Sequence, residues 1–505
     1  MRHFIGIDLG TSSVKSLLVD ENGGAVGVAQ RGYDIQKPEP SWAEQDMSLL
    51  WNATTETLRE LMGKFPSLKG QIAGIGFSGQ MHGLVMLGQN GEPVRRAIIW
   101  ADQRSQDAIA RISASVPGYR ETTLNNFSTG FLLCSLLWVK EHEPEVYENI
   151  RFVMLPKDYI RYKMCGEVGT DCSDASGTAA FDTAKRQWAW GMIRQLGLDE
   201  EFFVPCRESW EVAGRVTRRC AEETGLPEGV PIVYGGGDTL VQAVGNGLAK
   251  GEASSEGTLI SNIGTGSQLL CLADRPLHDP EFRTNTFCHV APSATRRERS
   301  EPSWLLMGAN LTGGVALKWL KGILGMESYE QMTNLALNAE PGSGGAVFLP
   351  YLNGERTPWN DPNARGIFFG LSLKHGREEL IRAVMEGIVL AQRETFEIFR
   401  QMGLSFQQVI ASGGGARSAA FRKIIASALS CTVRTSAVRE QGCVGAAILA
   451  AVGTGAFSSI AEACSHIVRF APEVTEPDPE WARSYDAVFE KFHALYPANK
   501  ELFEK

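Results

Sequence analysis

One carboxylate stands directly after a short apolar run near the start of the chain. Asp8 follows the strand-like residues Phe4–Ile7 and precedes the small-residue turn Gly10-Thr11-Ser12. A carboxylate at a strand end can hold Mg²⁺ through water, and the amides and hydroxyls of such a turn can face a phosphate. A plain hairpin explains the same residues equally well, so this segment indicates a phosphate site only in combination with others.

A second carboxylate follows a run of three glycines. Asp238 comes after Gly235–Gly237, which themselves follow the apolar run Val230–Tyr234. Glycines after a buried strand let a ligand approach the backbone, and strand ends are where α/β proteins bind ligands. A carboxylate there can accept the proton of a hydroxyl group while the alcohol attacks phosphorus. The alternative is that Asp238 caps a helix beginning at Thr239, and the two roles are compatible.

Two further glycine turns fit a nucleotide. Gly264–Ser267 is a second small-residue turn like Gly10-Thr11-Ser12, so two hairpins are expected to hold the phosphates from both sides. The alternative is that these glycines only provide the positive φ that a hairpin needs. Gly413–Ala416 precedes a helix expected over Ala419–Leu429, and such a glycine turn suits a flat adenine or ribose lying on the backbone. The segment from Glu440 into a helix expected over Cys443–Val452 is predicted to wall the same pocket.

Several other chemistries lack their motifs. The chain has no GxxxxGK[ST] phosphate loop, no HExxH zinc motif and no GxGxxG after a strand. The stretch Gly76–Gln80 departs from the GxSxG hydrolase pattern at its last position.

Strands and helices must position these turns, and hydrophobic periodicity predicts them. Apolar runs separated by turn residues predict a three-stranded meander over residues 4–29. A helix over Met47–Met62 and a buried strand over Gln71–Ser78 follow. The segment Ile7–Ser12 resembles Ser261–Gly266, and each lies between two strand-like runs, which predicts a duplicated architecture.

The second half is predicted to be more helical. An apolar face with helical spacing runs over Glu378–Met402 and is stopped by Gly403. A terminal helix is expected to begin with Asp478 as its N-cap and Pro479 at its first position.

Composition narrows the class of protein. The 505 residues, 43% of them apolar, predict two domains, over residues 1–248 and 249–505. A net charge of −9 disfavours nucleic acid as a partner, and the dense basic stretch Arg296–Arg299 is expected to be a solvated loop. Ten cysteines without CxxC spacing are typical of reduced, buried thiols. With no secretory signal and no bilayer-length apolar run, a cytoplasmic protein without a membrane partner is expected.

Six motifs, in order along essentially the whole chain, resemble the FGGY family of carbohydrate kinases within the actin/Hsp70/hexokinase-like superfamily. They are Gly6–Ser12, Gly79–Gly83, Leu155–Tyr159, Gly235–Asp238, Leu349–Pro358 and Gly413–Ser418. The resemblance implies an α/β fold of two actin-like (ribonuclease H-like) domains, each a mixed five-stranded sheet flanked by helices, with ATP and a sugar in the cleft between them. It also implies ATP and Mg²⁺ as cofactors, a small-molecule sugar as substrate, and suggests a homodimer.

The resemblance assigns roles residue by residue. It implies Asp238 as general base and Asp8 as a ligand of Mg²⁺ through water, with Asp238 also near the metal. The implied sugar-binding residues are Met81, His82, Trp100, Asp102, Asp238 and Thr239. The implied ATP-binding residues are Gly10, Thr11, Ser12, Gly264, Thr265, Gly314, Gly414, Gly415 and Ala416. The pairs Lys157-Asp158 and Glu355-Arg356 also match family motifs and are expected to hold loops in place.

Within this family, Gly79–Gly83 resembles the xylulokinases in particular. The expected reaction is therefore transfer of the γ-phosphate of ATP to D-xylulose, giving D-xylulose 5-phosphate. Thr239, Ala101 and residues 125–131 depart from the pattern of those enzymes, which leaves ribulose, gluconate or glycerol as alternative acceptors. A third interpretation is an ATPase of the chaperone or filament type. The segments Gly79–Gly83 and Gly235–Asp238 argue against it, because each suits a small polyhydroxylated ligand.

Overall fold

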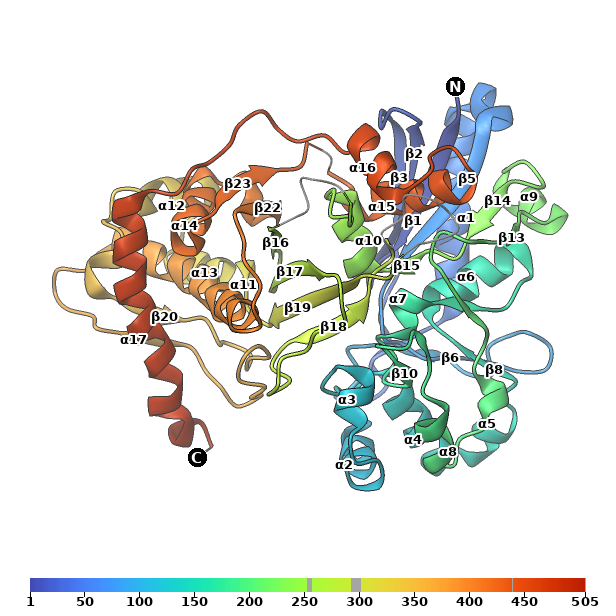
Figure 1. Cartoon of the computed structure of the whole chain (residues 1–505), viewed down its shortest axis with the longest axis horizontal. Helices are drawn as coiled ribbons and strands as arrows, with labels where there is room; N and C mark the ends of the chain where they lie inside the picture. Colours follow the sequence, from blue (N-terminus) through green and yellow to red (C-terminus); the bar gives the residue numbers. More distant parts are fainter. Residues whose placement is uncertain (252–256, 292–300, 438, 505) are drawn as a thin grey trace.

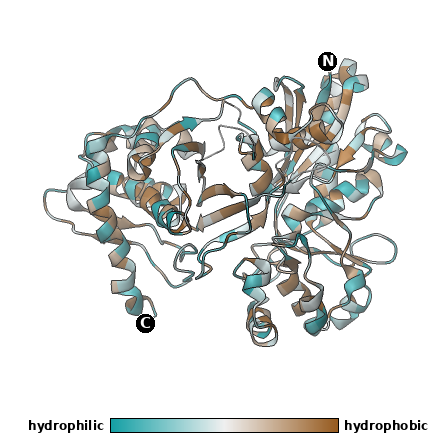
Figure 2. Cartoon of the chain, viewed as in Figure 1, coloured by the Kyte–Doolittle hydropathy of each residue, from teal (hydrophilic) through white to brown (hydrophobic). Residues whose placement is uncertain are grey.

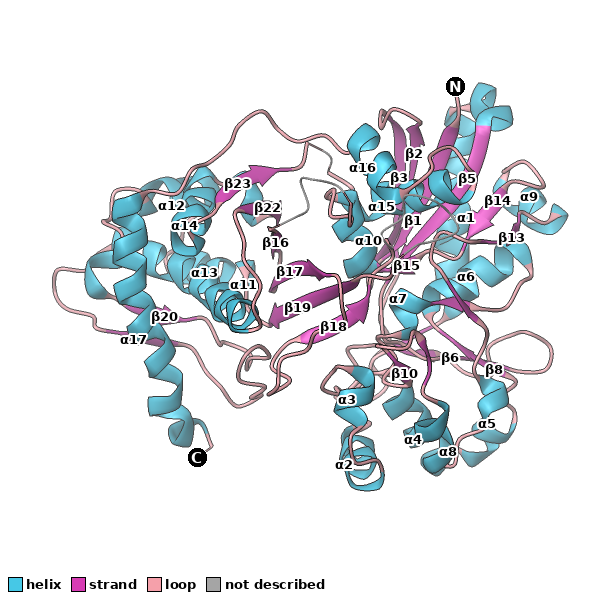
Figure 3. Ribbon diagram, viewed as in Figure 1, coloured by secondary structure: helices cyan, strands magenta, loops and turns pink. Residues whose placement is uncertain are grey.

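Two β-sheets flanked by helices organise the chain. The computed structural model describes residues 1–251, 257–291, 301–437 and 439–504 (Figure 1, Figure 3). The basic stretch Arg296–Arg299, expected to be a solvated loop, lies outside the described residues.

The first sheet is built on the predicted meander. Strands β1 (His3–Leu9), β2 (Ser13–Asp20) and β3 (Ala25–Gly32) pair antiparallel in succession. On the other side of β1, β5 (Ile72–Gly79) and β14 (Pro231–Val233) continue the sheet in parallel. The order is therefore β3-β2-β1-β5-β14.

The second sheet repeats this topology strand for strand. β16 (Thr258–Ile263) pairs antiparallel with β17 (Ser267–Ala273) and parallel with β22 (Gln408–Gly413). β19 (Trp304–Asn310) and β23 (Thr432–Thr435) give the order β19-β17-β16-β22-β23. The duplication predicted from two six-residue segments is confirmed, because each segment forms the first hairpin of its own sheet.

Both sheets contain more than the five strands expected. β13 (Val212–Arg215) joins β14, β15 (Gly236–Gly237) joins β5, and β18 (Asn285–Cys288) joins β19, so the described sheets have seven and six strands. These additional strands have two to four residues. Segments that short show no recognisable period, which is why the sequence did not reveal them.

Side-chain alternation divides the first sheet between two cores. Ile5 and Ile7 face a core shared with α1 (Met47–Lys64) and α6 (Pro156–Cys165), whereas Phe4 faces a core shared with α10 (Asp238–Gly245), α15 (Gln441–Gly453) and α16 (Ile460–Ile467). The second core also includes Ile260 and Leu270 of the second sheet. These three helices consequently form a layer between the two sheets (Figure 1), and Figure 2 shows the strands on both sides to be largely hydrophobic.

The other face of the second sheet carries the remaining large helices. α11 (Gly314–Ile323), α12 (Tyr329–Ala336), α13 (Arg377–Gln401) and α14 (Ala419–Leu429) pack there, and α17 (Pro479–Phe503) contacts α14 and α13. Asp478 caps α17 through the amides of Glu480 and Trp481, with Pro479 at its first position, as predicted. Within the described residues, no helix is both long and apolar enough to cross a membrane.

Helix α15 packs against the first sheet. That residues 440–452 wall the adenine pocket stays a prediction. A Cβ on Gly6 would lie 1.8 Å from the carbonyl oxygen of Cys443, and one on Gly445 would lie 2.0 Å from that of Val241 in α10. The physical reason is that this helix is apolar on all sides and therefore needs partners on all sides.

Candidate active site

Asp8 lies at the end of β1, next to two other strand ends. Asp8 pairs with Ser78 of β5, and Ser78 pairs with Gly236 of β15. Three strands thus end at one level, and Asp238 follows two residues beyond Gly236. The half-buried Asp8 accepts a 2.6 Å hydrogen bond from Ser78 Oγ. Burial raises the pKa of Asp8 above its usual value, although the Ser78 hydrogen bond and the charge of Lys15 oppose the shift.

Asp238 is the first residue of α10 and is half-buried. Its Oδ1 accepts a 2.7 Å hydrogen bond from the amide of Thr239, so one carboxylate oxygen is held by the helix start. Burial, and then the negative charge of Asp8, raise the pKa of Asp238 to about 7. A carboxylate with that pKa exchanges a proton near neutral pH, which is what a general base requires.

Met81 and His82 form the turn that leaves β5. A Cβ on Gly237 would lie 2.8 Å from Met81 Cγ, so this turn touches the glycines that precede Asp238. His82 stacks on Phe131 with ring centroids 4.1 Å apart, and its Nδ1 lies 2.6 Å from the carbonyl oxygen of Gly177. Because a carbonyl can only accept, Nδ1 carries the proton. Burial lowers the pKa of His82 to about 4, so the ring is neutral and Nε2 is a hydrogen-bond acceptor.

Trp100 and Asp102 are placed differently from each other. Trp100 is 38% exposed, and its Nε1 donates to Thr11 Oγ1 at 2.9 Å, which links it to the first hairpin turn. Asp102 is buried, and its two oxygens accept from the amide of Ala43 and from the amide and guanidinium of Arg104. With both oxygens occupied, Asp102 is not available to a ligand. Its hydrogen bonds indicate that Asp102 holds the loop that carries Trp100. Asp102 was expected to contact the sugar directly, and the structure gives it this positioning role instead.

The glycine turns of the second half meet at one edge of the second sheet. Ile263 of β16 pairs with Gly413 of β22, so the turns that follow them lie side by side. The amide of Gly314 donates to the carbonyl of Gly264 at 2.8 Å, which brings the start of α11 to the same place. Gly264, Thr265 and Gly414 are exposed. Residues from three distant segments thus meet at a single edge of the sheet.

A buried cluster of charged side chains packs against the end of β5. Lys157 Nζ lies 2.6 Å from Asp158, 2.7 Å from Asp171 and 3.4 Å from Asp174, and all four side chains are fully buried. A Cβ on Gly79 would lie 2.5 Å from Lys157 Cβ, so the lysine packs directly against the end of β5. The expected structural role of Lys157 and Asp158 fits this arrangement.

Glu355 and Arg356 do not form the expected pair. Glu355 is buried and accepts from the amides of Leu311 and Arg356, and burial raises its pKa to about 8. The Arg356 side chain is exposed, and its guanidinium makes no hydrogen bond or ion pair with any residue that the structure describes. Its positive charge helps to keep the pKa of His82 low, which places it near that ring. No local pattern in the sequence distinguished this arginine from a structural one.

The Lys15–Glu440 ion pair was also missed. It joins β2 to the residue before α15 at 2.6 Å, and both charges act on Asp8. The two residues are 425 positions apart in sequence, so only the fold brings them together.

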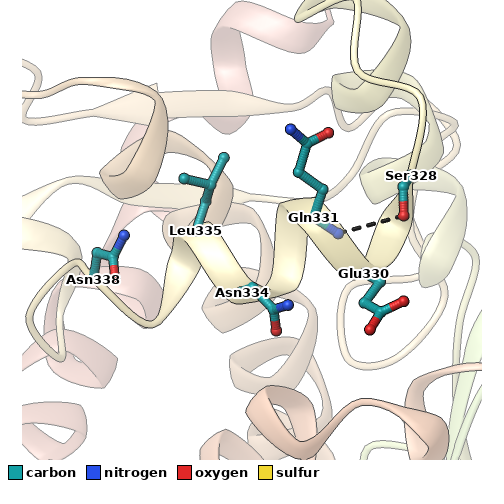
Figure 4. A pocket seen from close by; sticks show the side chains of 6 residues that line it. All are labelled: Ser328, Glu330, Gln331, Asn334, Leu335 and Asn338. Carbon is teal, nitrogen blue, oxygen red and sulfur yellow. Dashed lines mark hydrogen bonds between the residues drawn. The ribbon is translucent and has the colours of Figure 1, made fainter.

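A separate surface depression of about 560 Å³ lies along α12, away from these residues (Figure 4). It is lined by Ser328, Glu330, Gln331, Asn334, Leu335 and Asn338. Ser328 is the N-cap of α12, and its hydroxyl accepts from the amide of Gln331. The lining comes from one short segment, with no convergence of charged groups, and we assign it no role.

Comparisons with known proteins agree with this fold. The models of the N-terminal and C-terminal domains of the FGGY family of carbohydrate kinases match residues 3–245 and 259–454. A xylulose kinase of Bacillus subtilis (strain 168) is 33% identical over 505 residues, covering 99% of this chain and 98% of that protein. The crystal structure of xylulose kinase from Rhodospirillum rubrum superposes with a TM-score of 0.91 at 30% identity, covering 100% of both chains. A gluconokinase of Bacillus subtilis is 27% identical over 488 residues, covering 93% of this chain and 92% of that protein.

Proposed function

The chain belongs to the FGGY family of carbohydrate kinases, and from that premise we propose that it transfers the γ-phosphate of ATP to the primary hydroxyl of D-xylulose. The observation that carries the proposal is the placement of Asp238. It stands at the start of α10, beside the Met81–His82 turn and one strand away from Asp8, with a pKa of about 7.

Asp238 is the proposed general base. Its Oδ1 is held by the amide of Thr239, which leaves Oδ2 to face the acceptor hydroxyl. As the hydroxyl oxygen attacks the γ-phosphorus, Oδ2 accepts the proton and the leaving group departs on the opposite side. Neutral His82 offers Nε2 as an acceptor for another sugar hydroxyl, and Met81 provides apolar contact. Thr239 and Trp100 complete the proposed sugar contacts.

The residues around Asp8 fit a magnesium ion. Asp8 and Asp238 are two carboxylates whose charges disfavour each other, so a cation between them offsets a real repulsion. In the parts of the chain that the structure describes, no three His, Cys, Asp or Glu side chains gather as metal ligands. That arrangement suits Mg²⁺, which is usually held by one or two carboxylates, water and substrate phosphates. We propose Asp8 as its ligand through water, with Asp238 nearby; the ion would neutralise charge on the phosphates.

ATP is proposed to bind between the two hairpin turns. Gly10, Thr11 and Ser12 would face the phosphates from the first domain, and Gly264, Thr265 and Gly314 from the second, because the two turns join matching strands of the two sheets and Gly314 hydrogen-bonds to the second turn. Gly414, Gly415 and Ala416 would support adenosine. We propose that the division between the two domains lies between residues 248 and 249. We further propose that the enzyme is cytoplasmic and forms a homodimer.

Arg356 favours a second candidate acceptor. An unpaired guanidinium near His82 can bind a carboxylate through two parallel hydrogen bonds, and gluconate carries one whereas D-xylulose does not. Among the alternative acceptors, gluconate is therefore the one that a particular residue, Arg356, favours.

The test is ADP release with Mg-ATP and a panel of acceptors: D-xylulose, D- and L-ribulose, gluconate and glycerol. We expect strong stimulation by D-xylulose that is lost in Asp238→Ala. Asp107→Asn, at an exposed carboxylate of α2 (Gln106–Ser115), is the matched control and should behave as wild type. Stimulation by gluconate alone would replace the proposed sugar, and ATP hydrolysis indifferent to every acceptor would refute the kinase assignment.

A further inference from the structure

Two cysteines face each other where β12 (Cys206–Arg207) approaches the start of α7 (Cys172–Ala175). β9 (Thr170–Asp171) and β12 form a short parallel pair in which Thr170 is opposite Cys206. The sulfur atoms of Cys172 and Cys206 lie 3.5 Å apart, in direct contact. All ten cysteines of the chain are free thiols, and Cys206 alone is not fully buried. Cys206 is therefore the more exposed residue of the pair, and Cys172 lies directly behind it.

This pair is connected to the backbone that carries Asp238. Cys172 begins α7 (Cys172–Ala175), and the next residue, Ser173, accepts a 3.1 Å hydrogen bond from the amide of Gly237. The contact is tight, since a Cβ on Gly236 would lie 2.7 Å from Ser173 Oγ. A displacement of the Cys172 backbone would therefore reach Ser173 and the glycines immediately before Asp238.

We propose that Cys172 and Cys206 form a reversible disulfide that lowers the catalytic activity of the enzyme. The oxidant is a low-molecular-weight disulfide such as oxidised glutathione. Cys206, as thiolate, attacks one sulfur of that disulfide and releases one glutathione; Cys172 then attacks the sulfur of Cys206 and releases the second. The two protein thiols lose two electrons and two protons, and both pass to the two glutathione molecules.

The surroundings of the pair set the rate of this reaction and its specificity. Burial and the neighbouring thiol of Cys172 raise the pKa of Cys206 well above its usual value, so little thiolate is present and oxidation is slow. A third thiol, Cys288, reaches this region from β18, but its Sγ donates to the carbonyl of Thr183 at 3.4 Å. That thiol is engaged elsewhere, and the 3.5 Å contact selects Cys172 as the partner of Cys206.

The effect on activity follows from the distance that the sulfurs must travel. A covalent bond requires them to approach by more than about 1 Å from their 3.5 Å contact. Ser173 follows its neighbour, and the Gly237 amide loses its partner. Because a misplacement of about 1 Å near the reacting atoms can cost two orders of magnitude in rate, we expect kcat to fall by about tenfold or more.

The experiment incubates the full-length enzyme with oxidised glutathione and follows two quantities. The first is the disulfide itself, read by peptide mapping under non-reducing conditions. The second is kcat with the best acceptor, before and after reduction by dithiothreitol. We expect a Cys172–Cys206 linkage, a matching loss of kcat, and full recovery on reduction. Cys206→Ser should keep the unoxidised kcat and resist the oxidant, and Cys288→Ser should oxidise as wild type does.

The outcomes separate this inference from the proposed function. The expected loss of kcat rests on the proposed function. The Cys172–Cys206 disulfide is detected by peptide mapping, which needs no substrate. Oxidation that leaves Cys172 and Cys206 unlinked would overturn the proposal whatever the acceptor is. A complete linkage with unchanged kcat, or equal inactivation of Cys206→Ser, would overturn its functional part.

Discussion

Replacing Asp238 by asparagine should make the protein more stable while lowering its kcat by a factor of about 10² or more. The carboxylate is half-buried and lies near Asp8, and these two causes raise its pKa from 3.8 to about 7. Asparagine keeps an oxygen that can accept from the Thr239 amide, so the start of α10 is preserved. It removes the charge that the fold disfavours, and with it the ability to take a proton.

The magnitude follows from the pKa. A change from 3.8 to about 7 corresponds to about 4 kcal/mol by which folding disfavours the ionised carboxylate. Water reaches this half-buried side chain, so we halve that figure and expect about 2 kcal/mol. The unfolded chain ionises near pH 4 and the folded chain near pH 7, so the folded state holds the extra proton between them. Stability is therefore lost as pH rises through this window, and the gain from asparagine is full above about pH 7.

Thermal unfolding of wild type and Asp238→Asn at pH 8 and pH 5, without ligands, measures this gain. At pH 8 we expect the variant to unfold roughly 4–8 °C higher, if the first domain unfolds as a unit, and the difference should shrink at pH 5. Its kcat should fall by a factor of about 10² or more, since it has no general base. Asp107→Asn serves as the control and should change neither quantity. A variant no more stable than wild type at pH 8, or stabilised equally at both pH values, would refute the reasoning.

Three further predictions concern the base, the helix junction and the unpaired arginine. The kcat/KM of wild type should rise with pH through about 7 and then level off, because the free enzyme needs ionised Asp238; a profile flat from pH 5.5 to 8.5 would exclude this base. Gly445→Ala should cost about 3 kcal/mol or more in the free energy of unfolding, since its Cβ would lie 2.0 Å from a backbone oxygen of α10. Gly63→Ala, in a helix position with no atom within 4 Å, is its control and should stabilise by about 0.5–1 kcal/mol. Arg356→Gln should raise KM for the acceptor about tenfold with little change in KM for ATP, and an unchanged acceptor KM would place this arginine outside the sugar site.

The elements with strong local patterns were predicted well. The meander, the long helix α13, the helix α14 and the Asp478 cap all depend on periodicity or capping within a few residues, which a sequence displays directly. The duplicated sheets were also visible, because both copies retain a small-residue turn between two strand-like runs. The number of strands in each sheet could not be predicted, because β13, β15 and β18 form by pairing with a neighbouring strand and show no pattern of their own.

The site was predicted less completely than the fold. Motifs pointed to Asp8, Asp238 and the Met81–His82 turn, and the structure brings these together. For Asp102 the motif did not reveal the role, because only the structure shows that Ala43 and Arg104 occupy its oxygens. Such occupancy is a property of three-dimensional neighbours, and no spacing rule along the chain reports it.

Helix α15 connects the second half of the chain to the strand that carries Asp8. α15 comes late in the chain, yet its backbone touches β1 at Gly6 and α10 at Gly445, at distances that leave no room for a side chain. Close backbone contact over two surfaces resists sliding, because any shift would force carbonyl groups into neighbouring atoms. The first turn of α15 also adjoins Asp8, since Gly442 would place a Cβ 2.8 Å from its carboxylate. The second half of the chain therefore helps to position Asp8 of the first half, and α10 starts at Asp238 within the same packed layer. The two carboxylates are consequently fixed relative to each other by glycine contacts. Enlarging one of these glycines should therefore shift the carboxylates and disturb catalysis, although neither acid is itself replaced.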